Sequence, residues 1–257
     1  MMQLIKKIME KKGKEKIVSI TAYDYAFARI VEEAGFDFIL VGDSLAMVVL
    51  GYDSPIYATM QDMLRHTRAV ARGARKTLIV GDMPAGSYDT VDQAIENARA
   101  FIDAGAKAVK IEGPKKEIIK ALVEEGIPVM GHLGLTPQTI HDYRVQGKEK
   151  GEADRIKKEA KIVEKAGVFT IILECVPEKL GKEITELVSV PVVGIGAGRF
   201  CDGQILVIHD ILGLYDKFIP KFAKRYLNLR EEIYKALLEF KRDVLKGTFP
   251  SDEHVFK

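Results

Sequence analysis

Five apolar segments of this sequence end beside an acidic or titratable side chain, and such side chains can perform acid–base or metal chemistry. A single acid after an apolar segment is commonplace, because it often only caps the loop that follows. Five in succession are harder to explain in that way, since like charges gathered at one rim repel and need a cation or a shared proton between them. The five are Asp43, Asp82, Glu112, His132 and Glu174.

The first three acids, Asp43, Asp82 and Glu112, offer only oxygen atoms as ligands. Oxygen ligands favour a hard divalent ion, Mg²⁺ first, over zinc. Mg²⁺ usually keeps water in its shell, so we expect two of the acids to bind it directly and the third through water. One lone histidine does not make a zinc site, and we interpret His132 as a hydrogen-bonding neighbour of the substrate.

Lys110 precedes Glu112 by two residues in an extended segment, so the two side chains share a face. A lysine beside metal-bound acids stays protonated, which suits it to bind a substrate carboxylate or a polarised oxygen. The alternative is a Schiff-base nucleophile, as in many barrel aldolases. Neighbouring acids raise the pKa of a lysine and argue against that role.

Glu174 ends an apolar run that begins at Ile171 and continues beyond it at Val176. Apolar neighbours desolvate a carboxylate and make it a better proton acceptor, so we predict that Glu174 is a general base. The alternative is a structural one, in which Glu174 is a buried salt-bridge partner of Lys110.

The apolar segments have the length of strands, and they alternate with segments of helical periodicity. Three helical segments, Ala94–Ala104, Lys115–Glu125 and Ala153–Ala166, each end just before a glycine. Repeated strand–helix units predict an α/β fold, a (β/α)8 TIM barrel, in which the carboxyl ends of the strands form one rim for chemistry. The predicted strands are Ile17–Tyr23, Phe38–Gly42, Thr77–Gly81, Ala108–Ile111, Pro128–Gly131, Thr170–Leu173 and Pro191–Gly196.

The eighth unit is less regular than the others. Only five residues follow the glycine-rich end of the seventh predicted strand before the next apolar run, too few for a helical crossover between parallel strands. We therefore predict a helix at Gln204–Leu212, the eighth strand at Lys221–Leu227 and a closing helix at Arg230–Lys246. Apolar residues between Leu4 and Met9 predict an N-terminal helix that caps the bottom of the barrel.

Length and composition limit the remaining possibilities. The 257 residues are 47% hydrophobic, enough for one large core, and we expect a single catalytic domain over residues 1–257. A net charge of +2 with interspersed signs gives no reason to expect nucleic acid or a membrane surface as a partner. Two cysteines and an N-terminus without an apolar targeting segment indicate a cytoplasmic protein.

Several motifs at the predicted strand ends occur in the same order in one known family. They are Val41–Ser44, Val109–Gly113, Gly131–Gln138, Leu173–Pro177, Gly194–Gly198, Asp202–Val207 and Pro250–His254. From about Ile17 to the C-terminus the sequence resembles the ketopantoate hydroxymethyltransferase family. The resemblance implies an Mg²⁺-dependent enzyme of pantothenate and coenzyme A biosynthesis, which forms large homo-oligomers, here expected to be a homodecamer.

The same resemblance implies a reaction and a set of roles. A one-carbon unit passes from 5,10-methylenetetrahydrofolate to 3-methyl-2-oxobutanoate and gives 2-dehydropantoate. By the family's pattern Asp43 and Asp82 hold the metal, Glu112 completes its shell and Glu174 accepts the proton. The residues implied in contact with the keto acid are Asp43, Ser44, Asp82 and Lys110.

The chemistry of the residues agrees with this reaction. A 2-oxo acid can chelate Mg²⁺ through its carboxylate and keto oxygens, and the metal stabilises the enolate that forms when C3 loses its proton. One alternative is a metal-dependent lyase or mutase of the phosphoenolpyruvate/isocitrate type, which shares this metal–oxo-acid chemistry. Another is a barrel that only binds a metabolite, although five reactive groups on one rim exceed what binding requires.

Overall fold

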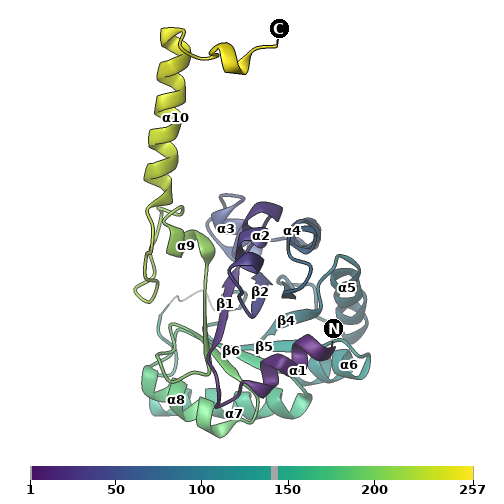
Figure 1. The fold of residues 1–257 in the computed structure, drawn as a ribbon. Helices are drawn as coiled ribbons and strands as arrows, with labels where there is room; N and C mark the ends of the chain where they lie inside the picture. The colour runs from purple at the N-terminus through teal and green to yellow at the C-terminus, as the bar shows by residue number, and fades with distance from the viewer. Residues whose placement is uncertain (1, 140–143, 257) are drawn as a thin grey trace. The chain divides into compact units, whose positions relative to one another are not determined.

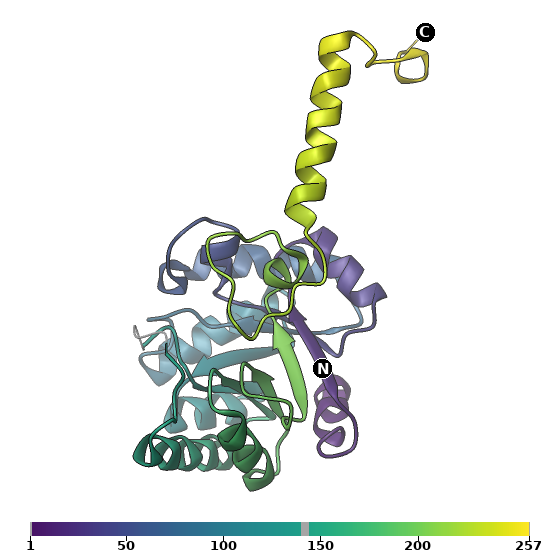
Figure 2. The same cartoon turned by 90° about the vertical axis from the view of Figure 1, so that its left-hand side faces the viewer.

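The computed structural model describes residues 2–139 and 144–256, and within them eight parallel strands close into a barrel in the order of the sequence (Figures 1 and 2). This confirms the predicted (β/α)8 fold. The strands are β1 (Ile17–Thr21), β2 (Phe38–Val41), β3 (Leu78–Asp82), β4 (Ala108–Glu112), β5 (Val129–Gly134), β6 (Thr170–Glu174), β7 (Val192–Ile195) and β8 (Gly203–Leu206).

Helices follow most strands and surround the barrel in Figure 1. The predicted helices at 94–104, 115–125 and 153–166 correspond to α5, α6 and α7, with ends that shift by one to three residues. In the barrel unit the helices are α1 (Met2–Glu10), α2 (Tyr25–Glu33), α3 (Leu45–Val48), η1 (Pro55–Tyr57), α4 (Met60–Gly73), α5 (Val91–Asp103), α6 (Lys116–Glu124), α7 (Lys150–Ala166) and α8 (Glu178–Leu187).

Apolar side chains fill the amino-terminal half of the barrel, where the strands begin. Ile5 and Ile8 of α1 belong to the same buried cluster as these strand residues, so α1 closes that end as predicted for a capping helix. The burial of both isoleucines follows from the spacing of three residues, which places them on one face of the helix. The strand residues of the cluster include Ile17, Phe38, Leu40, Leu78, Val80, Ala108, Met130, Ile172, Val193 and Ile205.

The prediction for the eighth strand is wrong. The strand is β8 at Gly203–Leu206, which pairs in parallel with both β7 and β1, while Lys221–Leu227 forms no strand and the predicted helix at 204–212 is reduced to α9 (Ile208–Leu212). A crossover need not be helical here. β7 has only four residues, about 13 Å, and the seven residues from 196 to 202 can span that length in irregular form.

Glycine is required where the chain returns to the barrel. A Cβ atom at Gly203 would lie 2.4 Å from the backbone oxygen of Ile17, so only glycine permits β8 to approach β1 this closely. Gly196 and Gly198 adopt positive φ angles of 67° and 85° in the preceding connection. The apolar run that begins at Ile205 therefore belongs to the last strand and not to a helix.

The chain divides into two compact units, the barrel up to Val207 and a second unit from Ile208 onward. The second unit contains α9, the 18-residue helix α10 (Leu229–Lys246) and the short turn η2 (Asp252–His254). α10 confirms the helix predicted at 230–246, and none of its residues is buried. No helix among the described residues is long and apolar enough to span a membrane.

Candidate active site

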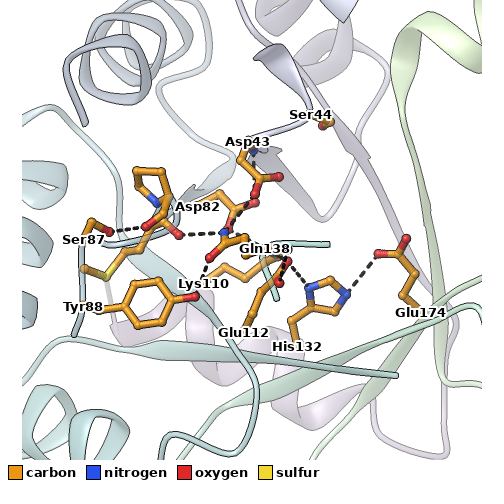
Figure 3. A network of polar contacts seen from close by, with 12 residues as sticks. Asp43, Ser44, Asp82, Ser87, Tyr88, Lys110, Glu112, His132, Gln138 and Glu174 are labelled. Carbon is orange, nitrogen blue, oxygen red and sulfur yellow. Dashed lines mark hydrogen bonds and ion pairs between the residues drawn. The ribbon is translucent and has the colours of Figure 1, made fainter. Parts of the chain in front are cut away.

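The pairing register of the strands explains which polar side chains meet at the carboxyl end of the barrel (Figure 3). Asp82 of β3 pairs with Lys110 of β4, and Glu112 of β4 pairs with His132 of β5. Residues paired in this way point to the same face of neighbouring strands, so their side chains become neighbours inside the barrel. All four side chains are buried.

Lys110 lies at the centre of the acids. Its Nζ atom is 2.6 Å from Oδ1 of Asp82 and 3.5 Å from Oε1 of Glu112. Burial opposes the charge of this ammonium group, but the attraction of Asp82, Glu112 and Asp43 outweighs it and raises the pKa of Lys110 above its usual value. A permanently protonated lysine agrees with a role in binding anionic oxygen atoms and disfavours a Schiff-base nucleophile.

Asp43 follows β2 and carries the least stable charge of the group. Its backbone N–H donates to Oδ2 of Asp82 over 3.1 Å, which brings the two carboxyl groups together. Burial and the negative charge of Asp82 raise the pKa of Asp43 well above its ordinary value. Without a further cation, Asp43 therefore tends to hold a proton, and a positive ion between the two carboxylates would release that proton.

His132 connects Glu112 to Glu174. Its Nδ1 atom is 3.0 Å from Oε1 of Glu112, and its Nε2 atom is 3.0 Å from Oε2 of Glu174, an ion-pair distance without the alignment of a hydrogen bond. Burial and Lys110 lower the pKa of His132, but Glu112 and Glu174 outweigh them and raise it to about 9. Burial likewise opposes the charge of Glu112, yet Lys110 and His132 lower its pKa to about 2.

Glu174 therefore lies beside a protonated imidazole rather than beside Lys110. The ion pairs that Lys110 makes within the described residues go to Asp82 and Glu112, so the alternative prediction, a salt bridge between Lys110 and Glu174, is wrong. The Glu174 side chain retains 18% of its exposure, whereas the other acids of the network are buried. Partial exposure leaves this carboxylate open to a substrate.

Ser44 stands apart from the network in Figure 3. Its hydroxyl group lies 2.8 Å from the hydroxyl of Tyr23, and it precedes the short helix α3. The structure thus brings Asp43, Asp82, Lys110 and the remaining acids together through direct contacts. Ser44 is held at the edge of the same rim, and its predicted contact with the keto acid stays a prediction.

Two polar residues of the site were not assigned a role from the sequence. Gln138 is buried, and its side chain contacts Asp43, while its backbone N–H contacts Glu112. Tyr88 donates its hydroxyl hydrogen to Gln138, and burial followed by the charge of Glu112 raises the pKa of Tyr88 above its usual value. Gln138 lies within a recognised motif and could have been suspected, but Tyr88 lies in a loop with no local signal.

The acids fit a divalent cation in number and kind, because their ligand atoms are all oxygen. Asp82 and Glu112 are each paired with Lys110, whereas the side chain of Asp43 accepts only from the neutral amide of Gln138 within the described residues, so an added cation would compensate its charge. Among the described residues no three acid, histidine or cysteine side chains form a complete ligand cluster. Asp43 and Asp82 would therefore hold the ion together with water or substrate oxygens, as Mg²⁺ prefers.

Glu112 is less available as a direct ligand, because both of its oxygen atoms are already engaged. Oε1 accepts from Lys110 and His132, and Oε2 accepts from the backbone N–H of Gln138. A water molecule between Glu112 and the ion would satisfy this geometry, in agreement with the expectation that one of three acids binds through water.

The chain matches the family model described as ketopantoate hydroxymethyltransferase over residues 3–252. Proteins named 3-methyl-2-oxobutanoate hydroxymethyltransferase are similar to it over nearly their whole length. The one from Thermotoga neapolitana is 55% identical over 98% of this chain and 96% of its own length. The one from Pyrococcus furiosus is 51% identical over 98% of this chain and 91% of its own length.

Solved structures of more distant enzymes share the fold. Phosphoenolpyruvate phosphomutase from Streptomyces platensis subsp. rosaceus is 15% identical, with a TM-score of 0.66 over 99% of this chain and 91% of its own. A phosphonopyruvate hydrolase in complex with oxalate and Mg²⁺ is also 15% identical, with a TM-score of 0.61 over 98% of this chain and 93% of its own. These likenesses concern the barrel fold alone, whereas the family match rests on the sequence. The chain is a member of the ketopantoate hydroxymethyltransferase family.

Proposed function

We propose that this chain transfers a one-carbon unit from 5,10-methylenetetrahydrofolate to 3-methyl-2-oxobutanoate and so forms 2-dehydropantoate for pantothenate and coenzyme A biosynthesis. The names of its relatives support the acceptor and the type of reaction. The two cysteines, Cys175 and Cys201, are free thiols, which is in keeping with a role in the reducing cytoplasm.

One observation carries the proposal: a buried lysine among acids, and an aspartate pair in which Asp82 is bound to that lysine and Asp43 is not, lie on the same rim as a partly exposed glutamate. A divalent cation held by Asp43 and Asp82 would supply Lewis-acid stabilisation for the charge that develops on the oxygens of the keto acid. A solved structure with the same fold contains Mg²⁺ together with oxalate, a small dicarboxylate, which supports a hard ion beside a carboxylate ligand. Lys110 adds a fixed positive charge beside the same oxygens.

Glu174 is the proton acceptor in this proposal. Its carboxylate is the acid of the network that retains exposure, so C3 of the keto acid can reach it. His132 lies against Oε2 of Glu174 and holds that oxygen in place, which leaves Oε1 to take the proton. The one-carbon unit leaves the folate by hydrolysis of its two carbon–nitrogen bonds: water supplies the oxygen that becomes the product hydroxyl, and tetrahydrofolate departs with the two protons of that water. The carbon that has lost its proton then attacks this one-carbon unit, and the proton held by Glu174 passes to the new alkoxide, with no covalent bond to the enzyme required.

The test is the exchange of the C3 proton of 3-methyl-2-oxobutanoate with D₂O, followed by NMR with Mg²⁺ and without folate. We expect exchange in the unaltered enzyme and its loss, by at least about a hundredfold, in Glu174→Gln, since general-base catalysis contributes a factor of that size. Glu183→Gln is the matched control, because Glu183 pairs with Lys157 on the outer surface. Undiminished exchange in Glu174→Gln would refute the assignment of the base.

The complete reaction is tested with 5,10-methylenetetrahydrofolate as the donor. We expect 2-dehydropantoate as the product, detected by mass spectrometry. Proton exchange without product formation would leave the enolate chemistry in place and exclude this donor. Cleavage of a phosphonate or of a branched malate instead would favour a lyase or mutase reaction.

We also propose that copies of the chain assemble into a homo-oligomer, a decamer by family resemblance. Support comes from α10, whose residues are all outside the core although several are large and apolar. Ile233, Leu237, Phe240 and Val244 are spaced three or four residues apart and so share one face of the helix. Sedimentation should give a single large species, and Leu237→Glu should reduce its mass; an unchanged mass would contradict this role of α10.

A further inference from the structure

Gln138 is placed among the acids of the site by a tight turn after β5. The turn spans Thr136 to Thr139, and the backbone N–H of Thr139 donates to the carbonyl oxygen of Thr136 over 3.0 Å. Pro137 occupies the second position of the turn, where its fixed φ angle is favourable. As a result Gln138, the third residue, is buried beside the carboxylates rather than directed to solvent.

Four hydrogen bonds surround Gln138 (Figure 3). Its Nε2 atom donates to Oδ2 of Asp43 over 2.8 Å and to the carbonyl oxygen of Met83 over 3.0 Å. Its Oε1 atom accepts from the hydroxyl of Tyr88 over 2.5 Å. Its backbone N–H donates to Oε2 of Glu112 over 3.1 Å. Gln138, which follows β5, thus contacts residues at the ends of three other strands, β2, β3 and β4.

These partners allow only one orientation of the side-chain amide. The carbonyl of Met83 can only accept a hydrogen bond, so the nitrogen rather than the oxygen must face it. The reversed amide would direct Oε1 at two acceptors, Met83 and Asp43, and would leave the amide nitrogen facing the Tyr88 hydroxyl. In the observed orientation both amide hydrogens and one lone pair are used, and Asp43 necessarily receives a donor.

A neutral donor has a particular consequence for Asp43. Gln138 binds only Oδ2, which leaves Oδ1 of the same carboxylate to another partner. A lysine or arginine at this position would neutralise Asp43 and compete with a metal ion for it. An amide fixes the carboxylate without cancelling its charge, whereas Asp82 is already paired with the charged Lys110.

We propose that Gln138 is a positioning residue for the metal site: its amide, oriented by Tyr88 and the Met83 carbonyl, holds Asp43 so that Oδ1 is presented to a divalent cation. This inference rests on the proposed function, in which Asp43 and Asp82 hold that cation. Partners that orient a ligand in this way affect metal affinity by about ten- to a hundredfold when they are removed.

The probe is Mn²⁺ alone, a hard ion that can be followed by EPR, with the full-length protein and without keto acid or folate. In Gln138→Met, which keeps the length of the side chain and removes its polar atoms, we expect the Kd for Mn²⁺ to rise about tenfold. In Tyr88→Phe, which removes a single hydroxyl from the amide, we expect a rise of about fivefold, the effect of one hydrogen bond.

Gln146→Met is the matched control. Gln146 is also buried, but its Nε2 atom donates to the carbonyl oxygen of Arg144, and among the described residues it bonds to none of the acids of the site. We expect its Mn²⁺ affinity to equal that of the unaltered protein. A general loss of packing would weaken Mn²⁺ binding in both glutamine variants, and that result would overturn the inference.

A second measurement separates positioning from a structural role. Raising Mg²⁺ should restore most of the C3 proton exchange in Gln138→Met and in Tyr88→Phe, because only the affinity for the ion is impaired. Equal Mn²⁺ affinity in these variants and in the unaltered protein would overturn the role of Gln138 and leave the proposed function intact. No Mn²⁺ binding in the unaltered protein would instead remove the metal site on which both proposals depend.

Discussion

Two buried aspartates at opposite ends of the barrel, Asp202 and Asp43, are held in different ways. Asp202, at the amino end, accepts hydrogen bonds from the backbone of Gly13 and of Val192, and its Oδ2 atom is 2.8 Å from Nζ of Lys12. Its charge is therefore matched by groups within the chain. Asp43, at the carboxyl end, receives one neutral donor at its side chain and lies against a second acid, which raises its pKa.

The contrast shows what separates a structural carboxylate from one available for chemistry. The partners of Asp202 tie the start of β7 and the turn before β1 together, where α1 closes the barrel. At the other end the acids exceed the cations, and the imbalance is met only by an added ion or by a proton. This agrees with the general division in such barrels between a stabilising bottom and a catalytic top.

The same substitution at both aspartates tests this contrast, and the largest effect is expected for Asp43→Asn. The asparagine oxygen can still accept from Gln138, but its amide nitrogen would face the metal, so proton exchange and turnover should fall at least about a hundredfold. Burial raises the pKa of Asp43 in the folded state, so its ionisation costs stability as pH rises above the unfolded value. Thermal unfolding at pH 7 without metal should therefore show an equal or higher Tm.

Asp202→Asn should show the opposite pattern. The variant loses the ion pair with Lys12 and one of the two hydrogen bonds that Asp202 accepts from backbone N–H groups. The free energy of unfolding should therefore fall by about 2 kcal/mol, a value that allows for the weakening of the ion pair by solvent. Below its unfolding temperature the enzyme should keep its kcat and Mg²⁺ dependence. Denaturant unfolding and kinetics measure the two effects; a loss of kcat at unchanged stability would contradict the structural role.

The sequence was sufficient to predict that polar side chains gather at the carboxyl end of the barrel, because strand-length apolar runs and the acids that follow them are local features. It was sufficient for seven strands and for the capping helix for the same reason. It was misleading for β8, which has four residues, begins with the tightly packed Gly203 and follows a connection without a helix. The position of β8 depends on its pairing with β1, a contact between distant parts of the sequence that no local pattern indicates.

The contacts within the site depend on register and on loops, so they could not be derived from the sequence. The position of His132 between two acids follows from the pairing of Glu112 with His132 and of Gly134 with Glu174. Gln138 reaches Asp43 only because a turn directs it inward, and Tyr88 meets Gln138 across 50 positions of the chain. Residue types at strand ends predict the kind of chemistry, whereas the hydrogen-bond and ion-pair partners of each side chain can be identified only from the folded structure.

The smallest expected effect concerns Glu32, a second acid at the amino end. Its Oε2 atom accepts from the backbone N–H groups of Lys76 and Thr77, just before β3. Burial is the largest single influence and opposes the charge, but the hydrogen bonds together outweigh it and lower the pKa of Glu32 below its ordinary value. Because its pKa is lower in the folded state, the ionised Glu32 carboxylate stabilises the fold at pH values above its unfolded pKa of about 4.3. This stabilisation is lost as the pH falls through the pKa of the folded state.

Glu32→Gln should therefore be less stable than the unaltered protein at pH 7, by a few tenths of a kcal/mol because the group is largely solvated. The difference should stay constant down to about pH 5 and shrink below the ordinary pKa of a glutamate. Urea unfolding at pH 7, 5 and 3.5 measures it, with Glu33→Gln as the control, since Glu33 is exposed and, in the part of the chain that the structure describes, pairs with Arg29 of its own helix alone. If the stability difference grew as pH falls, the pKa of Glu32 would be raised on folding and not lowered. Glu32 would then resemble Asp43, an acid whose charge is unfavourable in the folded protein.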